Sequence, residues 1–224
     1  MKIWTGWRVE SADDDEPCFR KVVPAEMIPI QPRFEFRAWA NRLDAVHRRI
    51  RALSECHRTQ ETTDIYIVST DVVDVNPKIR EGELDIKVLI AAREGFEQWE
   101  PRVKLSFPVP AALMRDEVFP MLGRPAPDLG SGTISTSRFL TDVVQQCEGM
   151  TAVEVAKRRH AFTVDGCITE FAEISIAGTD LQTASIESVD IEALRDARRL
   201  IGLDAYDNIS YPAAVKSAIG WTSS

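Results

Sequence analysis

Hydrophobic and polar residues alternate one by one over many short stretches of this chain, which is the pattern of β-strands buried on one face. In the first such stretch, Phe34, Phe36 and Ala38 share one face, and the charged residues between them share the other. The same alternation predicts strands over residues 33–39, 64–69, 77–80, 83–90, 102–107, 153–164, 169–176 and 183–189.

Elsewhere, apolar residues recur every three or four positions, as on the buried side of an amphipathic helix. The clearest predicted helix begins after Asp190, a good N-cap residue, and ends before Gly202. The stretch from 108 to 137 is rich in Pro, Gly and Ser, and we expect it to be mainly a connection. The predicted helices cover residues 43–53, 111–118, 137–147, 191–201 and 210–220.

Most predicted strands are joined by short connections, which is typical of antiparallel pairs, and Asp165-Gly166 is a strong hairpin signal. About eight strands with helices inserted and appended predict an α+β fold. The sheet is expected either to stay open, with one face in water, or to curl and close. Residues 1–32 carry an acidic run and several prolines, so we expect an N-terminal extension before a domain of residues 33–224.

Composition narrows the possible partners and location. The chain has 224 residues and a formal net charge of −8, which argues against general binding to nucleic acids. No apolar run approaches the ~20 residues of a membrane-spanning helix, and the first residues lack the apolar core of a signal peptide. The four cysteines show no Cys-x-x-Cys spacing, so we expect a cytoplasmic protein without a zinc site. The sequence does not indicate an oligomeric state.

The basic residues of the predicted strands lie opposite the apolar positions. In an open sheet they face water. In a closed sheet they converge on an interior, where like charges require interleaved carboxylates or a multivalent anion such as a polyphosphate. Carboxylates in the same phase suit a divalent metal that bridges phosphate oxygens. The basic residues are Arg33, Arg37, Lys78, Arg80, Lys87, Arg102, Lys104, Lys157 and Arg159, and the acidic ones are Glu35, Asp85, Glu173 and Glu187.

These residues occur in short motifs that follow one another in a definite order along the chain. The first half contains Arg33-Phe34-Glu35-Phe36-Arg37, Lys78-Ile79-Arg80 and Leu84-Asp85-Ile86-Lys87, and the second contains Lys157-Arg158-Arg159, the acidic strand around Glu170 and Glu173, and Ala184-Ser185-Ile186-Glu187. This series resembles the CYTH superfamily, the triphosphate tunnel metalloenzymes. Its members include inorganic triphosphatases, thiamine triphosphatases and class IV adenylyl cyclases.

The resemblance implies an eight-stranded antiparallel β-barrel, closed or nearly closed into a tunnel, with flanking helices. It also implies a small polyanionic ligand such as a triphosphate, nucleotide or polyphosphate, and Mg or Mn as the cofactor. Glu35 and Lys87 are the predicted catalytic residues, and Glu35, Glu173 and Glu187 the predicted metal ligands. The predicted substrate-binding residues are Arg33, Arg37, Lys78, Arg80, Lys87, Arg102, Lys104, Lys157 and Arg159.

Two positions depart from the family pattern. Arg33 stands where the family's opening Glu-x-Glu-x-Lys motif has its first glutamate, and Ser185 stands where the late strand has another. Each change removes a hard oxygen ligand for a metal. The sequence therefore leaves three functions open: a metal-dependent triphosphatase, a polyphosphate- or nucleotide-binding module without the full metal site, and a structural domain with an open sheet. No feature indicates adenine recognition, which favours hydrolysis over cyclisation.

Overall fold

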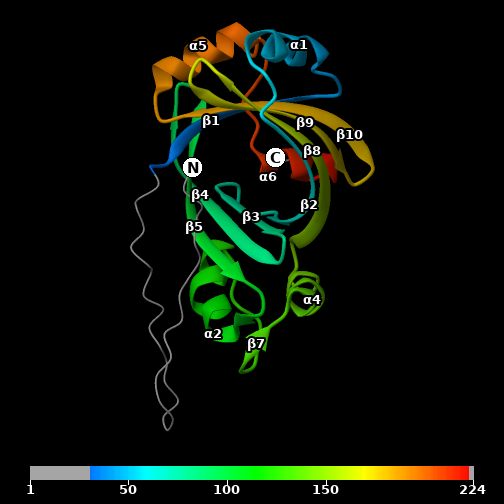
Figure 1. Ribbon diagram of the computed structural model, residues 1–224. Helices are drawn as coiled ribbons and strands as arrows, with labels where there is room; N and C mark the ends of the chain where they lie inside the picture. The colour runs from blue at the N-terminus through cyan, green and yellow to red at the C-terminus, as the bar shows by residue number, and fades with distance from the viewer. Residues whose placement is uncertain (1–30, 222–224) are drawn as a thin grey trace, which may run out of the picture. The chain divides into compact units, whose positions relative to one another are not determined.

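A computed structural model of the chain describes residues 31–221, and its main feature is a closed antiparallel barrel (Figure 1). Around the barrel the strands follow the order β1-β10-β9-β8-β2-β3-β4-β5, and β5 pairs with β1 to close the ring. This confirms the predicted eight-stranded α+β barrel and excludes the open sheet. The strands are β1 (Arg33–Ala40), β2 (Arg58–Ser69), β3 (Val75–Arg80), β4 (Glu83–Arg93), β5 (Phe96–Ser106), β8 (Met150–Val164), β9 (Cys167–Ile176) and β10 (Thr179–Ser188).

Tight two-residue turns set the register of four strand pairs. At the predicted hairpin, Asp165 and Gly166 have φ angles of 49° and 73°. Ala177 and Gly178 adopt the same left-handed conformation, with φ angles of 48° and 81°. This backbone matches the right-handed twist of the flanking strands, and glycine adopts it without steric cost. Glu81-Gly82 and Glu94-Gly95 form the other two turns.

Two strands begin six residues earlier than the sequence pattern predicts. β2 begins at Arg58, although the prediction starts at residue 64, because its first half is polar on both faces and shows no alternation. Pairing with residues 156–161 of β8 holds this half in the sheet. β5 begins at Phe96 and not at residue 102, since the segment between them does not alternate cleanly. The predicted extension 1–32 lies outside the described residues, apart from its last two.

The helices α1 (Asp44–Leu53) and α5 (Ile191–Ile201) cover one side of the barrel from outside (Figure 1). Their apolar faces pack on outward-facing residues of β1, β8, β9 and β10, as Ile50 and Leu194 do near Phe36 and Phe171. Asp190 caps α5 as predicted, because its carboxylate accepts hydrogen bonds from the first turn.

The segment between β5 and β8 covers a second part of the outer wall. Its helices pack Met114, Phe119 and Phe139 against Ile79 and Leu84 of β3 and β4. The expected helices over 111–118 and 137–147 are each broken into short helical pieces. These elements are β6 (Val109–Pro110), α2 (Ala111–Leu113), η1 (Met114–Val118), α3 (Phe119–Met121), β7 (Thr133–Ile134), α4 (Thr136–Arg138) and η2 (Phe139–Val144). No helix in the described part of the chain is long and apolar enough to cross a membrane.

The last helix, α6 (Tyr211–Ala218), packs on the inner face of the barrel. Tyr211 and Val215 contact an apolar cluster that includes Tyr66 of β2, Val155 of β8 and Ile174 of β9. The inner wall is therefore apolar beside α6 and charged farther along the same strands. This division determines where a polar ligand can bind.

Candidate functional site

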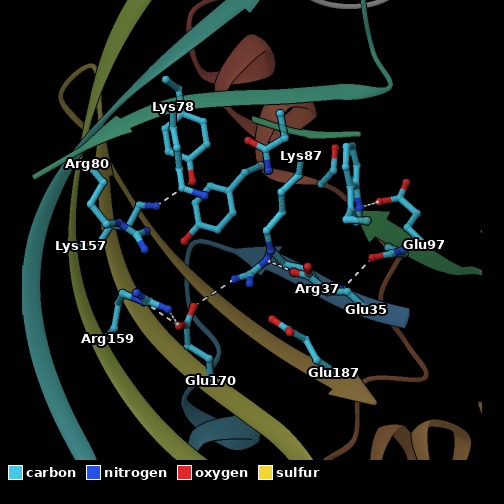
Figure 2. A pocket seen from close by; sticks show the side chains of 16 residues that line it. Glu35, Arg37, Lys78, Arg80, Lys87, Glu97, Lys157, Arg159, Glu170 and Glu187 are labelled. Carbon is cyan, nitrogen blue, oxygen red and sulfur yellow. Dashed lines mark hydrogen bonds and ion pairs between the residues drawn. The ribbon is translucent and has the colours of Figure 1, made fainter. Parts of the chain in front are cut away.

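A pocket of about 110 Å³ lies inside the barrel and is lined mainly by charged side chains (Figure 2). Cations reach it from four separate strands, which is the convergence that a closed barrel predicts. The expected ligand-binding residues that line it are Arg37 of β1, Lys78 and Arg80 of β3, Lys87 of β4, and Lys157 and Arg159 of β8. Both residues predicted to be catalytic, Glu35 and Lys87, also line it.

Asp64 neutralises two of these cations from behind the pocket wall. The carboxylate is fully buried. Its Oδ1 accepts a hydrogen bond from Arg80 Nε at 2.7 Å, and its Oδ2 accepts one from Lys157 Nζ at 2.7 Å. Burial alone would raise the pKa of Asp64, but its bonds to Arg80 and Lys157 outweigh this effect and lower it.

Lys157 is a cation whose charge burial strongly disfavours. Its ammonium donates to Tyr66 Oη at 2.7 Å and lies 4.0 Å from the centre of the Tyr211 ring. Desolvation lowers the pKa of Lys157 to about 7, although Asp64 opposes the shift. Asp64 also pairs with Arg80, so its single negative charge cannot balance the two positive charges. Lys157 therefore changes its charge near neutral pH.

Glu170 holds a second pair of cations. Arg159 Nε donates to its Oε2 at 2.6 Å, and Arg37 Nη1 lies 3.3 Å from its Oε1. Burial would raise the pKa of Glu170, but the two guanidinium groups outweigh burial and lower it. Arg37 is also bound to Glu35, whose Oε1 accepts from Nε at 2.7 Å. These contacts fix both guanidinium groups in place before any ligand arrives.

The two lysines on the opposite wall differ in their partners. Lys78 Nζ forms an ion pair with Asp85 Oδ2 at 2.9 Å. Lys87 extends into the pocket towards Arg37 (Figure 2) and makes no hydrogen bond or ion pair with any residue from 31 to 221. Its ammonium is therefore available to an anion without first breaking a contact.

Three carboxylates stand side by side at another part of the wall. Glu35 of β1 is the direct cross-strand partner of Glu187 on β10 and of Glu97 on β5. Burial raises the pKa of Glu187, and the charge of Glu35 raises it further. The pKa of Glu97 is raised by burial and by Glu35, with a hydrogen bond from Trp99 opposing the shift. Like charges placed opposite each other in this way destabilise the sheet unless a cation compensates them.

These carboxylates fit a hard divalent ion by their chemistry, because Mg and Mn prefer carboxylate oxygens. As the side chains stand within residues 31–221, no three Asp, Glu, His or Cys groups are gathered closely enough to hold a metal. The register nevertheless gives the row Glu97, Glu35 and Glu187 as the donor set available to an ion.

Several predicted residues lie away from the pocket. Glu173, a predicted metal ligand, is half exposed and lies 3.8 Å from Arg158, so the expectation that it shares a site with Glu35 is corrected. Glu173 lies three positions after the inward-facing Glu170, so its side chain points to the opposite face of the strand. Arg33 is also absent from the lining and lies 3.8 Å from Glu187. The remaining two, Arg102 and Lys104, form ion pairs with Glu100 and Glu83 outside the pocket.

The sequence interpretation missed several residues of the site. Asp64 and Tyr66 alternate with Ile65 and Ile67, so their phase was visible, but no basic neighbour on the strand marked them. Glu97 was missed because its strand was predicted to start later. No periodic signal marks the last group, which comprises Asn76, Asn208, Ser210 and Tyr211.

Comparison with known proteins gives a match in structure alone. No family model and no curated protein sequence matches the chain. The proposed adenylyl cyclase HpAC1 from Hippeastrum, described as having a dominant triphosphatase activity, superposes with a TM-score of 0.50 at 16% identity, over 83% of this chain and 96% of that one. A conserved hypothetical protein from Pyrococcus furiosus gives a TM-score of 0.48 at 14% identity, over 80% and 98%.

A third structure, a proposed adenylate cyclase from Bacillus halodurans, gives a TM-score of 0.43 at 11% identity, over 79% of this chain and 91% of that one. At these identities the matches concern the fold. Together with the HpAC1 match, the closed ring of eight antiparallel strands confirms the architecture that the sequence motifs implied. The chain shares its fold with the HpAC1 structure.

Proposed function

We propose that this protein binds a triphosphate-containing ligand inside its barrel and hydrolyses a phosphoanhydride bond of that ligand. The observation that carries the proposal is the convergence of cations from four strands on one small pocket. Guanidinium and ammonium groups are the usual partners of phosphate oxygens. The pocket is lined mainly by charged side chains, so its contents would be the phosphate chain.

The geometry supports catalysis by positioning and charge neutralisation. Phosphoryl transfer needs little covalent help from the protein, since the reacting groups must mainly be aligned and their charge compensated. Arg37 and Arg159, each fixed by Glu170, would orient phosphate oxygens on one wall. Lys87, which makes no hydrogen bond or ion pair within the described chain, would neutralise charge from the opposite wall.

Glu35, Glu97 and Glu187 would hold Mg or Mn. When bound, a divalent ion polarises a phosphoryl oxygen and promotes ionisation of a water. Glu35 is tied to Arg37 through a hydrogen bond of 2.7 Å, so it couples the carboxylate row to the phosphate-binding wall. Glu97 on the neighbouring strand would compensate for the glutamate that Arg33 replaces.

A second function, polyphosphate binding without turnover, is favoured by two residues. Arg33 and Ser185 stand at positions where the CYTH motifs carry metal-binding glutamates. In such a protein the basic wall would still bind the ligand, while the incomplete carboxylate set would leave it intact.

One experiment separates these functions. Phosphate release from tripolyphosphate, thiamine triphosphate and ATP is measured with Mg and with Mn, for the wild type and for Glu187→Gln. Turnover that the variant loses supports the hydrolase. Thermal stabilisation by tripolyphosphate without turnover supports the binding module. If neither turnover nor stabilisation occurs, both proposals fail.

A further inference from the structure

Two buried polar atoms without a hydrogen-bond partner belong to residues that line the ligand pocket. They are the hydroxyl of Tyr211 and the side-chain oxygen of Asn76. Tyr211 is only 9% exposed. Leaving a buried polar group unpaired is costly, and most such groups in folded proteins are paired. Two unpaired polar atoms at one pocket therefore indicate that a hydrogen-bonding partner belongs in that pocket.

Contacts on several sides fix the ring of Tyr211. It lies 4.6 Å from the Arg37 guanidinium carbon and 4.0 Å from Lys157 Nζ, both over the ring. It stacks on Tyr66 at 5.2 Å between ring centres and meets Trp39 edge-on at 4.9 Å. A ring held in this way cannot easily turn its hydroxyl towards another partner.

The backbone of Tyr211 is equally well anchored. It is the first residue of α6, and the preceding Ser210 caps the helix through Ala213. Asn208 accepts a hydrogen bond from the backbone N–H of Arg37 at 2.7 Å, and this bond ties the segment to β1. The position of the hydroxyl is thus set by packing and hydrogen bonds before any ligand binds.

The neighbouring tyrosine shows that this arrangement is specific. Tyr66 accepts a hydrogen bond from Lys157 at 2.7 Å, so its hydroxyl is satisfied within the protein. Tyr211 lies against the same lysine but presents its ring to it. Burial raises the pKa of Tyr211, and the charged residues that affect it most are Arg37, Glu170, Arg159 and Glu35. The hydroxyl stays protonated at neutral pH and remains a hydrogen-bond donor.

Asn76 lines the same pocket. It lies on β3 and is the direct cross-strand partner of Lys87, which also lines the pocket. Its amide can present either its oxygen or its nitrogen to the pocket, since the two ends exchange by a flip. An anionic ligand would select the nitrogen.

We infer that the Tyr211 hydroxyl donates a hydrogen bond to a phosphoryl oxygen of the ligand, and that the Asn76 amide donates a second one. This inference rests on the proposed function and specifies how the ligand is recognised. The two neutral donors add fixed hydrogen bonds to the attraction and orientation that the cations supply. α6 is then part of the binding site as well as of the core.

The test uses Tyr211→Phe and Asn76→Ala in the full chain, with Tyr206→Phe as the matched control outside the pocket. Tripolyphosphate binding is measured by calorimetry and unfolding by urea titration. Tyr211→Phe keeps the ring and its cation–π contacts, so the free protein should be as stable as the wild type or more stable. Its dissociation constant for tripolyphosphate should rise about tenfold, the effect of one hydrogen bond to a charged group. Asn76→Ala should weaken binding in the same direction.

The outcomes distinguish a failure of the Tyr211 inference from a failure of the proposed function. If wild type, Tyr211→Phe and Tyr206→Phe bind tripolyphosphate equally, the Tyr211 inference is overturned while the proposed function stands. A loss of stability in Tyr211→Phe would also overturn it, because it would reveal a partner for the hydroxyl inside the protein. If the wild type does not bind tripolyphosphate, the proposed function fails and this inference fails with it.

Discussion

Replacing Lys87 by methionine should weaken ligand binding without weakening the fold. Lys87 lines the pocket and makes no hydrogen bond or ion pair with the described residues, so its removal leaves no buried partner unpaired. The free energy of unfolding should therefore stay within about 0.5 kcal/mol of the wild-type value, as for substitutions that break no contact. Arg159→Met differs, because it deprives the buried Glu170 of one of its two guanidinium partners.

The expected loss of affinity follows from the type of contact. A hydrogen bond to a charged group contributes about 1.5–3 kcal/mol, which corresponds to a rise of roughly 10- to 150-fold in the dissociation constant. Both Lys87→Met and Arg159→Met should show a loss of this order for tripolyphosphate. Arg159→Met should in addition lower the free energy of unfolding by about 1–3 kcal/mol, since Glu170 is left partly uncompensated.

Calorimetric titration with tripolyphosphate gives the affinity, and urea unfolding of the free protein gives the stability. Arg102→Met is the control, because Arg102 pairs with Glu100 outside the pocket and should change neither quantity strongly. The reasoning is refuted if Lys87→Met binds as tightly as the wild type, or if Arg102→Met loses as much affinity as Lys87→Met.

Four further results are expected. The pKa of Lys157 is about 7 in the folded protein and 10.5 in the unfolded chain. The unfolded chain therefore binds more protons between these values, and the free energy of unfolding should rise by up to about 1.4 kcal/mol per pH unit. In urea unfolding, Lys157→Met should lose this slope. The same deprotonation should weaken tripolyphosphate binding as the pH rises above 7, and an unchanged pH profile in Lys157→Met would contradict the assignment. Asp64→Asn leaves Arg80 and Lys157 without their shared carboxylate, so it should destabilise the free protein by about 3–5 kcal/mol in the same assay. Mg should raise the thermal midpoint of the wild type and of Glu173→Gln but not of Glu187→Gln; an equal shift in all three would exclude the carboxylate row.

Local sequence patterns predicted the strands, the main helices and the phase of most basic residues. Alternation along β1 placed Arg37 opposite Phe36, and the structure has Arg37 in the pocket and Phe36 beneath the outer helices. Alternation could not decide whether the sheet closes, because an open sheet with a wet face has the same period. The closed sheet was instead predicted from the order of the motifs and the family resemblance that it carries.

The misplacement of Glu173 has a physical cause. Glu173 was assigned to the inner face because polar residues were equated with that face, but the inner wall beside α6 is apolar. In β9 the inward phase therefore contains Ala172 and Ile174 along with Glu170, and a rule based on polarity alone selects the wrong glutamate. Tyr211 and Asn76 have no such signal, since their role depends on contacts between segments that are far apart in the sequence.

The order in which the chain is synthesised bears on when the pocket can exist. β1, the first strand, pairs with β10, the last, and Tyr211 of α6 lies against Arg37 of β1. A nascent chain on the ribosome therefore carries an unclosed sheet until nearly all of it has emerged. Such distant pairings are slow to form, and a product that stops before residue 211 would lack one wall of the cavity. The complete pocket can therefore form only after translation has reached the end of the domain.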